Sequence, residues 1–285
     1  MATQPRMDAP SSSDGISPRL FRSIADIVYA EAGITLPPSK QTMVSGRLRR
    51  RMRTLGFATL NDYCEFVCDP NVDRDEIEHL INAVTTNKTD FFREPRHFDY
   101  LRENILPELQ QRGQRMVRCW SAAASTGAEP YTLAMVLDNY ALANSGPDYR
   151  VIATDLDTEV LQTAIKGIYP RDQMAPVPKD LRARYVLDAR DPARGEVRIV
   201  PKLRKKISFG RLNLMDRHYP VGDKLDVIFC RNVLIYFDKE TQYAVISRLI
   251  EKLSSGGHLI LGHSETIPAA DFGLTTVGST VFRKG

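Results

Sequence analysis

The sequence has no long apolar segment. Its uninterrupted apolar runs reach five residues at most, as at Val233–Phe237, whereas a membrane-spanning helix needs about 20. Residues 1–18 also lack the apolar core of a secretory signal, and their proline, serine and glycine are typical of a disordered lead-in. We therefore expect a cytoplasmic protein that does not span a membrane and whose residues 1–18 form a disordered tail.

Cysteine is scarce as well. The four cysteines include one pair separated by three residues, with no second pair at the spacing of a zinc ribbon: Cys64, Cys68, Cys119 and Cys230. Buried, reduced thiols are therefore the preferred interpretation, and no metal site is predicted.

The sequence carries little net charge, and +4 is too small to indicate a nucleic-acid partner. Residues 40–53 nevertheless contain six basic residues and no acidic one. A helix over this segment would place four apolar residues on one stripe, namely Val44, Leu48, Met52 and Leu55. The arginines that lie mostly outside the stripe are Arg47, Arg50, Arg51 and Arg53. They form either a solvated surface or a docking face for an acidic helical partner.

From residue 116 onward, strand and helix patterns alternate. The predicted strands cover 116–123, 149–157, 224–232 and 258–264, and helices are predicted over 129–142, 158–167 and 239–255. Gly256 and Gly257 are expected to close the last of these helices. The alternation predicts a parallel sheet in an α/β domain over 116–285. Two short apolar runs around a turn-rich segment predict a β insertion over about 168–210.

Polar residues follow four of the predicted strands, at the edge where an open α/β sheet binds its ligands. They are Glu129, Asp155, Asn213 with Leu214, and Arg231 with Asn232. One such residue alone is more often a helix cap, but four strand ends in sequence order favour a ligand site. An acidic residue after the second strand can accept both hydroxyls of a ribose.

The loop after the first strand is poor in glycine. Within WSAAASTGAEPYTLAM, residues 120–135, only Gly127 remains. A pyrophosphate needs several backbone amides and a helix N-terminus, and Glu129 would repel it. A cationic ligand bearing adenosine tolerates that carboxylate, so S-adenosylmethionine fits this loop better than a dinucleotide.

Several longer strings, in order along the chain, resemble the CheR family, the S-adenosylmethionine-dependent methyltransferases of bacterial chemotaxis receptors. The strings are NAVTTNKTDFFRE (82–94), WSAAASTGAEPYTLAM (120–135), ATDLDTEVL (153–161), GIYPRDQM (167–174), NLMD (213–216), DVIFCRNVLIYFD (226–238) and GHSE (262–265). The resemblance covers about residues 20–282. It implies an α/β class I methyltransferase domain, Rossmann-like and with a small β insertion, preceded by a small all-α receptor-docking domain over 19–86 and a linker over 87–115.

The resemblance also implies the residues of the cofactor pocket. For S-adenosylmethionine they are Asn87, Thr89 and Arg93 from the linker, with Glu129, Asp155, Asn213, Leu214, Arg231 and Asn232 from the sheet edge. The sequence departs from many relatives at Ala128, where they carry Glu, so Glu129 alone is carried over from that pair.

Family members methylate glutamate side chains of helical receptor bundles to γ-carboxyl methyl esters and leave S-adenosylhomocysteine. On this basis we expect Arg93 and Tyr236 to position the substrate carboxylate or the methyl donor, although composition alone would make Tyr236 a packed aromatic. Docking of an acidic receptor helix then falls to Arg47, Arg50, Arg51 and Arg53. In tethered relatives the β insertion binds a C-terminal receptor peptide as an added strand. The protein is expected to act as a monomer, recruited to receptor arrays in the membrane.

Three other functions remain open. One is methylation of RNA or of another protein side chain, although the aromatic and basic interleaving of a single-strand RNA platform is absent from the sequence. A second is a cofactor sensor or scaffold without transfer. The third is an NAD-linked oxidoreductase, which the glycine-poor loop disfavours.

Overall fold

The computed structural model describes residues 15–285, and most of the tail expected over 1–18 lies outside this range. Residue 18, which was expected to end the disordered tail, is instead the first residue of a helix. The α1 helix begins at Pro18 because the Ser17 hydroxyl caps it by accepting the Leu20 N–H. The chain divides into two compact units, Met1–Thr85 and Thr86–Gly285. Among the described residues, no helix combines the length and apolar character needed to cross a membrane.

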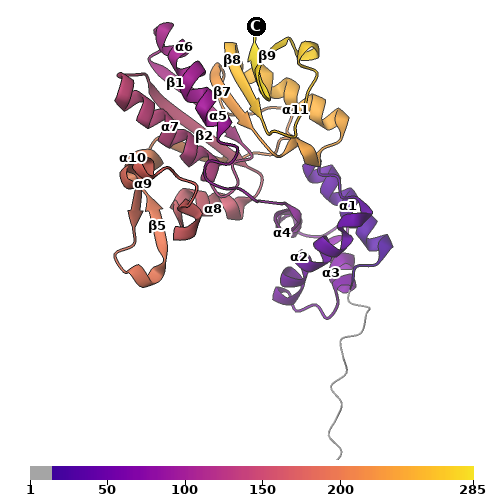
Figure 1. The fold of residues 1–285 in the computed structure, drawn as a ribbon. Helices are drawn as coiled ribbons and strands as arrows, with labels where there is room; N and C mark the ends of the chain where they lie inside the picture. Colours follow the sequence, from indigo (N-terminus) through magenta and orange to yellow (C-terminus); the bar gives the residue numbers. More distant parts are fainter. Residues whose placement is uncertain (1–14) are drawn as a thin grey trace, which may run out of the picture. The chain divides into compact units, whose positions relative to one another are not determined.

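The described part of the first unit is helical (Figure 1). Its elements are α1 (Pro18–Ala32), a 3-10 turn η1 (Pro38–Lys40), α2 (Gln41–Thr54), α3 (Leu60–Val67) and α4 (Arg74–Val84). Side chains of Ser17, Thr59 and Asp73 cap three of these helices, which explains where they start. Their apolar faces supply the buried core of this unit.

Helix α2 carries the basic segment. Val44, Leu48 and Met52 are buried, in agreement with the expected stripe. Leu55 was expected on the same stripe but is 40% exposed. The helix ends at Thr54 and Leu55 is its C-cap, so the side chain leaves the apolar face.

The second unit contains a seven-stranded sheet in the order β6-β2-β1-β7-β8-β10-β9. Its strands are β1 (Met116–Ala122), β2 (Asp148–Asp155), β6 (Ile207–Arg211), β7 (Leu225–Cys230), β8 (Leu253–Leu261), β9 (Leu274–Gly278) and β10 (Val281–Lys284). The neighbouring pairs from β6 to β8 are parallel, and β10 is antiparallel to both β8 and β9. Parallel strands direct their carboxyl ends to one edge of a sheet, so the loops after β1, β2, β6 and β7 lie along that edge.

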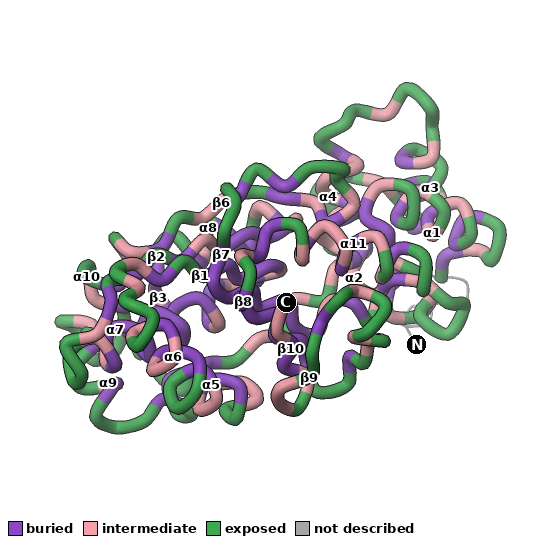
Figure 2. Tube along the Cα trace, turned by 90° about the horizontal axis from the view of Figure 1, so that it is seen from above, coloured by how far each residue is buried: buried purple, intermediate pink, exposed green. Residues whose placement is uncertain are grey.

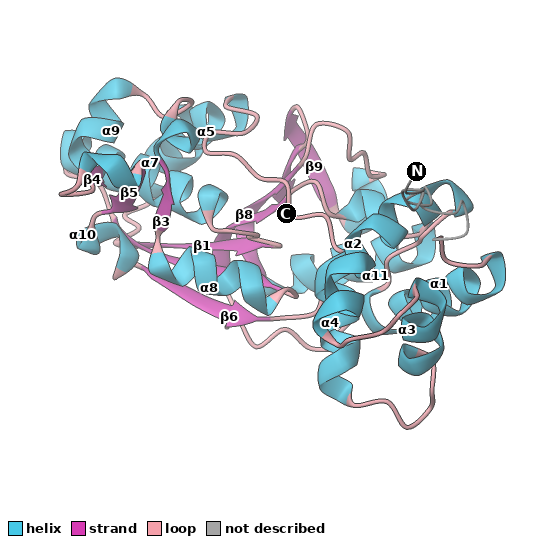
Figure 3. Cartoon of the chain, turned by 90° about the horizontal axis from the view of Figure 1, so that it is seen from below, coloured by secondary structure: helices cyan, strands magenta, loops and turns pink. Residues whose placement is uncertain are grey.

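Helices cover both faces of this sheet (Figure 3). On one side lie α5 (Arg96–Tyr100), the π-helical turn η2 (Leu101–Ile105), α6 (Leu106–Gln111), α7 (Ala128–Asn144) and α8 (Thr158–Lys166), whose Ala164 carbonyl accepts the Tyr131 hydroxyl of α7. On the other side lies α11 (Lys239–Lys252). The central strands are buried along almost their whole length, as the purple segments of Figure 2 show. All six residues of β7 are buried, which is typical of a parallel strand covered on both faces.

A separate three-stranded antiparallel sheet has the order β3-β5-β4. It consists of β3 (Ile168–Pro170), β4 (Val186–Asp188) and β5 (Glu196–Ile199), with the short helical segments η3 (Arg171–Met174), α9 (Lys179–Tyr185), η4 (Pro192–Arg194) and α10 (Pro201–Arg204) around it. The insertion expected to reach about residue 210 is shorter in the structure. Its sheet ends at Ile199, and residues 207–211 pair with β2 in the large sheet.

The end of α11 also differs from the prediction. Gly256 and Gly257 were expected to close this helix, but it ends at Lys252 and the chain passes directly into β8. Gly256 has a φ of 72°, and the register between β7 and β8 shifts at this point. The two glycines therefore shape an irregular strand, which is a common role of glycine inside a sheet. The remaining elements are η5 (Leu234–Tyr236) and η6 (Ala269–Phe272).

Candidate functional site

The segment before the large sheet is fastened to the sheet's carboxyl edge by hydrogen bonds. The Asn87 side-chain amide donates to Asp157 at 2.6 Å, and the Ser125 hydroxyl donates to the Asn87 carbonyl at 2.8 Å. Farther along, the Arg231 guanidinium donates to the Arg93 carbonyl at 2.6 Å. Residues 87–94 therefore lie beside the ends of β1, β2 and β7.

Arg231 is the centre of a buried ion cluster at this edge. It follows β7, and its side chain is 2% exposed. Its guanidinium lies 2.9 Å from a Glu94 carboxylate oxygen and 3.0 Å from one of Glu129. The guanidinium carbon also lies 5.4 Å from the Phe98 ring centre, a cation–π contact. Two carboxylates share one guanidinium, so with both ionised the cluster carries a net charge of about −1, which suits a cationic ligand.

The two carboxylates of the cluster differ in their electrostatics. Burial alone would raise the pKa of Glu94, but hydrogen bonds from Arg231 and Asn232 outweigh burial and lower this pKa to about 2. Burial raises the pKa of Glu129, although Arg231 and the Ser121 hydroxyl, which donates at 2.7 Å, act in the opposite direction. Glu94 is therefore the firmly ionised partner of Arg231.

Asp155 ends β2 and holds the loop after β1. One carboxylate oxygen accepts the Ser125 N–H at 2.7 Å and the other accepts the Asp157 N–H at 2.9 Å. Burial raises the pKa of Asp155 to about 6, opposed by these backbone N–H groups. The Leu156 N–H also bonds this carboxylate. A carboxylate has about four acceptor positions, so about one remains for the ribose that this residue is expected to bind.

The loop after β6 carries Asn213 and Leu214. The Leu212 N–H donates to the Asp155 carbonyl at 3.0 Å, which joins this loop to the end of β2. The Asn213 side chain accepts the Met215 N–H at 2.9 Å and shapes the turn, while Leu214 is buried. The loop is thus at the expected edge.

Three further candidates are half-buried, namely Thr89, Arg93 and Tyr236. The Arg93 guanidinium donates to the Lys88 carbonyl at 2.8 Å. Tyr236 lies in η5, and its hydroxyl makes no hydrogen bond with the described part of the chain. These contacts do not test the roles that the sequence suggested for the three residues, which stay predictions.

The structure adds two carboxylates to which the sequence assigned no role. Glu94 lies in the TDFFRE string and bonds the side chains of both Arg231 and Asn232. Glu265 ends the GHSE string, and its buried carboxylate accepts four backbone N–H groups. Both strings were singled out in the sequence, but neither glutamate follows one of the strand ends from which candidates were drawn.

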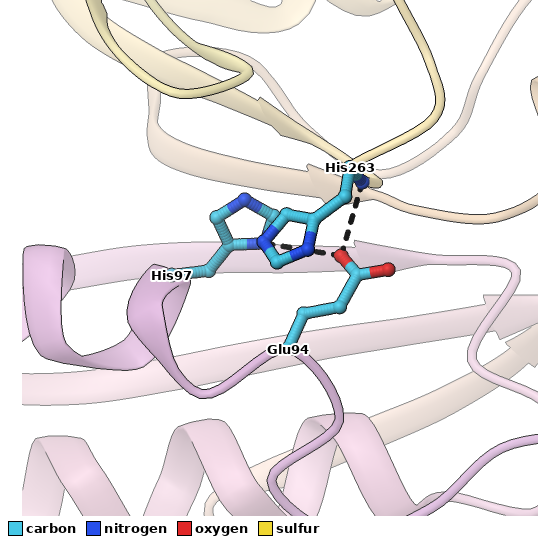
Figure 4. Close-up of side chains that lie close together, drawn as sticks. All are labelled: Glu94, His97 and His263. Atoms are coloured by element: carbon cyan, nitrogen blue, oxygen red, sulfur yellow. Dashed lines mark hydrogen bonds and ion pairs between the residues drawn. The ribbon is translucent and has the colours of Figure 1, made fainter.

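Glu94, His97 and His263 form the one group of possible metal ligands found among the described residues (Figure 4). Their ligand atoms lie within 4.8 Å of one another. Burial lowers the pKa of His97 to about 4, so this ring is neutral near pH 7. The Glu94 carboxylate is already paired with Arg231, and a divalent cation here would lie next to that guanidinium. We therefore assign Glu94 to Arg231.

The basic face of α2 is partly used inside the first unit. Arg51 forms an ion pair with the buried Glu76, and Arg47 donates to the carbonyls of Val84 and Thr85 at the end of α4. Arg50 and Arg53 are exposed. The four arginines proposed for docking thus differ, because Arg47 and Arg51 also stabilise the helix packing.

Residues 87–282 match the family model described as "CheR methyltransferase, SAM binding domain". Residues 19–85 match "CheR methyltransferase, all-alpha domain". The α/β fold, the cluster of two carboxylates and one guanidinium at the carboxyl edge of the sheet and these matches define an S-adenosylmethionine-dependent methyltransferase with a helical N-terminal domain. The two carboxylates and the small side chains of the loop after β1 both fit this cofactor.

Curated relatives agree with this class. The chain is 38% identical to chemotaxis protein methyltransferase 2 of Pseudomonas aeruginosa, over 92% of this chain and 91% of the relative. It is 39% identical to the chemotaxis protein methyltransferase of Salmonella typhimurium, over 92% and 88%. The corresponding Escherichia coli protein is 38% identical over 92% and 89%. The chain belongs to the CheR family of methyltransferases.

Proposed function

We propose that this enzyme methylates glutamate side chains of bacterial chemotaxis receptors and so serves sensory adaptation. The observation that carries the proposal is family membership over nearly the whole chain, with relatives that are named chemotaxis protein methyltransferases. When bound, S-adenosylmethionine supplies a methyl group and leaves as S-adenosylhomocysteine. A glutamate with the ordinary pKa of ~4.3 is already an anion at neutral pH, so the site needs no strong base.

The protein's part in this reaction is orientation, which can supply roughly 7–11 kcal/mol when reactants are well placed. We propose that Arg93 and Tyr236 position the substrate carboxylate or the methyl donor. Arg93 has five N–H donors, and its bond to the Lys88 carbonyl leaves others for a carboxylate. Tyr236 lies in η5, five residues after Arg231, and its hydroxyl makes no hydrogen bond with the described part of the chain, so it is available as a donor.

The direct test is incubation with methyl-labelled S-adenosylmethionine and membranes that contain candidate receptors. Label on a receptor that mild alkali releases identifies an ester. Alkali-stable label would instead indicate nitrogen or carbon methylation, and absence of label, with cofactor binding intact, would favour a sensor or scaffold.

Single-residue variants test the positioning roles. Arg93→Ala and Tyr236→Phe should lower kcat more than they weaken S-adenosylhomocysteine binding, because the groups act on the reacting atoms. Arg96→Ala is the matched control, since Arg96 is an exposed arginine three residues along the same segment. Normal turnover in both test variants would remove the assignment.

We propose that exposed basic residues of α2 dock an acidic receptor helix. Since Arg47 and Arg51 have contacts inside the unit, the charge-reversed variant should carry Arg50→Glu and Arg53→Glu. It should raise KM for the receptor far more than it lowers kcat, and more at low salt. Arg22→Glu, on the exposed side of α1, controls for net charge. An unchanged KM at low salt would contradict docking there.

We further propose that the β3-β5-β4 sheet binds a C-terminal receptor peptide as an added strand, which recruits the enzyme to receptor arrays in the membrane. The sheet ends at β3 and β4, and Leu187 on β4 is 50% exposed, so an edge and an apolar contact are both present. Receptors without their last few residues should then be methylated more slowly. Equal rates with and without those residues would contradict the tether.

A further inference from the structure

Glu265 is buried at the catalytic edge, although neither the cofactor site nor the proposed chemistry uses it. Glu265 is 4% exposed and lies just after β8. One carboxylate oxygen accepts the N–H groups of Val233 and Leu234 at 2.9 and 2.8 Å. The other accepts those of Asn232 and Gly262 at 2.8 and 2.6 Å. All four acceptor positions of the carboxylate are thereby used.

The three donors at 232–234 are successive amides of the loop after β7. They converge because Asn232 has a left-handed φ of 58° and Val233 returns to a φ of −124°. Such a turn forms an anion-binding concavity of backbone N–H groups. Here a carboxylate of the same chain fills it, since a neutral acceptor such as an amide could not satisfy both pairs of donors.

The fixed loop carries the side chains that the site depends on. Arg231 and Asn232 come directly from it, and Tyr236 closes the next turn by donating its N–H to the Val233 carbonyl at 3.1 Å. Glu94 bonds the side chains of Arg231 and Asn232, while Glu265 holds the backbone. The two glutamates therefore fix different parts of one loop.

Close packing supports this division. A Cβ atom added at Gly262 would lie 2.6 Å from the Asn232 side-chain nitrogen and 2.8 Å from the Glu265 carboxylate. The end of β8 therefore lies directly against the loop, and only glycine leaves room for the carboxylate there.

We propose that Glu265 is a positioning residue of this methyltransferase, whose carboxylate holds the loop over 231–236 in the conformation that places Arg231 and Asn232 for the cofactor and Tyr236 for transfer. The part that concerns Tyr236 rests on the proposed function. The part that concerns cofactor binding does not depend on the identity of the methyl acceptor.

The test compares Glu265→Gln with a matched control, Asp226→Asn. Asp226 is also a buried carboxylate, 6% exposed, and accepts the Arg118 N–H at 2.8 Å, but it lies near the start of β7, away from the carboxyl edge. Gln keeps the size of Glu, yet its NH2 group must face one of the two donor pairs. For each folded variant, calorimetry gives the Kd of S-adenosylhomocysteine and labelled receptor membranes give kcat and KM.

We expect both variants to lose thermal stability but only Glu265→Gln to lose function. Its kcat should fall by about 10²-fold, the scale of a 1 Å misplacement of reacting groups, with cofactor binding weakened by about tenfold. Kd and kcat within twofold of those of Asp226→Asn would overturn the proposal.

Glu265→Asp keeps the charge but withdraws the carboxylate by one methylene, and it serves if the Gln variant does not fold. Impaired function in the folded Asp variant supports a role of reach and geometry, whereas full function in it would overturn that role. If wild type binds S-adenosylhomocysteine but labels no receptor, the proposed function fails, and the Kd comparison still decides the role of Glu265.

Discussion

Two loops at the carboxyl edge of the sheet leave neighbouring strands and are held in different ways. The loop after β1 consists of small residues, with left-handed φ angles at Ala123, Ser125 and Gly127. One of its amides donates to a carboxylate, that of Asp155. The loop after β7 has charged and aromatic side chains, and three of its amides donate to Glu265. A loop that offers its backbone surface needs small side chains, whereas a loop that aims large side chains needs a rigid backbone.

The largest expected effect is on the β7 side. Arg231→Met keeps the volume of the side chain but leaves Glu94 and Glu129 buried without their cation. Breaking a buried pair in this way should lower the free energy of unfolding by ~3–5 kcal/mol, measured by denaturant titration at pH 7. Arg102→Met is the control, because the Arg102–Asp99 pair is exposed and worth ~0–1 kcal/mol. Equal losses in the two variants would mean that the cluster does not stabilise this loop.

Asp155 holds the β1 loop and Glu94 bonds side chains of the β7 loop. The stability that each contributes should depend on pH with opposite signs. Burial raises the pKa of Asp155 from 3.8 to about 6, so the stability associated with its neutral form is present below pH 3.8 and lost as pH rises through 6. Against burial, hydrogen bonds from Arg231 and Asn232 lower the pKa of Glu94 from 4.5 to about 2, so its contribution is present above pH 4.5 and lost as pH falls through 2. Each can reach about 3 kcal/mol.

The measurement is unfolding free energy against pH for wild type, Asp155→Asn and Glu94→Gln. The advantage of wild type over Asp155→Asn should shrink from pH 4 to 6, and its advantage over Glu94→Gln should shrink below pH 4.5. Slopes of the same sign would contradict the contrast between the loops.

Each loop also depends on one closely packed glycine. A Cβ at Gly127, where φ is 93°, would lie 2.8 Å from the Ala164 Cβ, and one at Gly262 would lie 2.9 Å from the Asn232 backbone nitrogen. Alanine at either position should cost ~1–3 kcal/mol through overpacking, with added backbone strain at Gly127. Gly46→Ala in α2 is the control, since no atom lies within 4 Å of the added Cβ. Thermal melts of the three variants would show whether Gly127→Ala and Gly262→Ala lose stability while Gly46→Ala does not.

The smallest expected effect concerns the link from the β1 loop to residues 87–94. Ser125→Ala removes the hydroxyl bond to the Asn87 carbonyl and keeps the backbone bond to Asp155. The expected loss is ~1 kcal/mol, while Ser247→Ala, on an exposed hydroxyl of α11, should change stability by less than ~0.5 kcal/mol. A loss larger than that from Gly127→Ala would show that the β1 loop is held mainly by this link.

The sequence predicted where the strands of the sheet end. Alternating strand and helix patterns located these ends, and the structure places Glu129, Asp155 and Arg231 beside them, whereas their roles stay predictions. Glu94 and Glu265 were missed because their partners lie far away in the chain, and for Glu94 these are the side chains of Arg231 and Asn232. The amides that Glu265 binds in the β7 loop lie 31–33 residues away in the chain, and no local pattern reveals that pairing.

Local errors also had physical reasons. The apolar spacing of α2 extended to Leu55, but the end of the helix at Thr54 decides where that side chain points. Gly256 and Gly257 gave a helix-stop signal, yet the strand that follows needed them for its own irregular start. The apolar run of β6 was read as part of the insertion because pairing with β2 depends on tertiary structure.

The hydrogen bonds from the β7 loop to Glu265 join that loop to the end of β8 and so form a closed circuit of contacts within one β-α-β segment, residues 225–265. The loop, the helix α11 and the strand β8 are consecutive in the chain, and no linker separates α11 from β8. The closing contacts of this circuit span 31–33 residues but involve no residue outside this segment, so they do not depend on more distant parts of the chain. The amides of Asn232, Val233 and Leu234 should then exchange their hydrogens together, as one cooperative unit with β8.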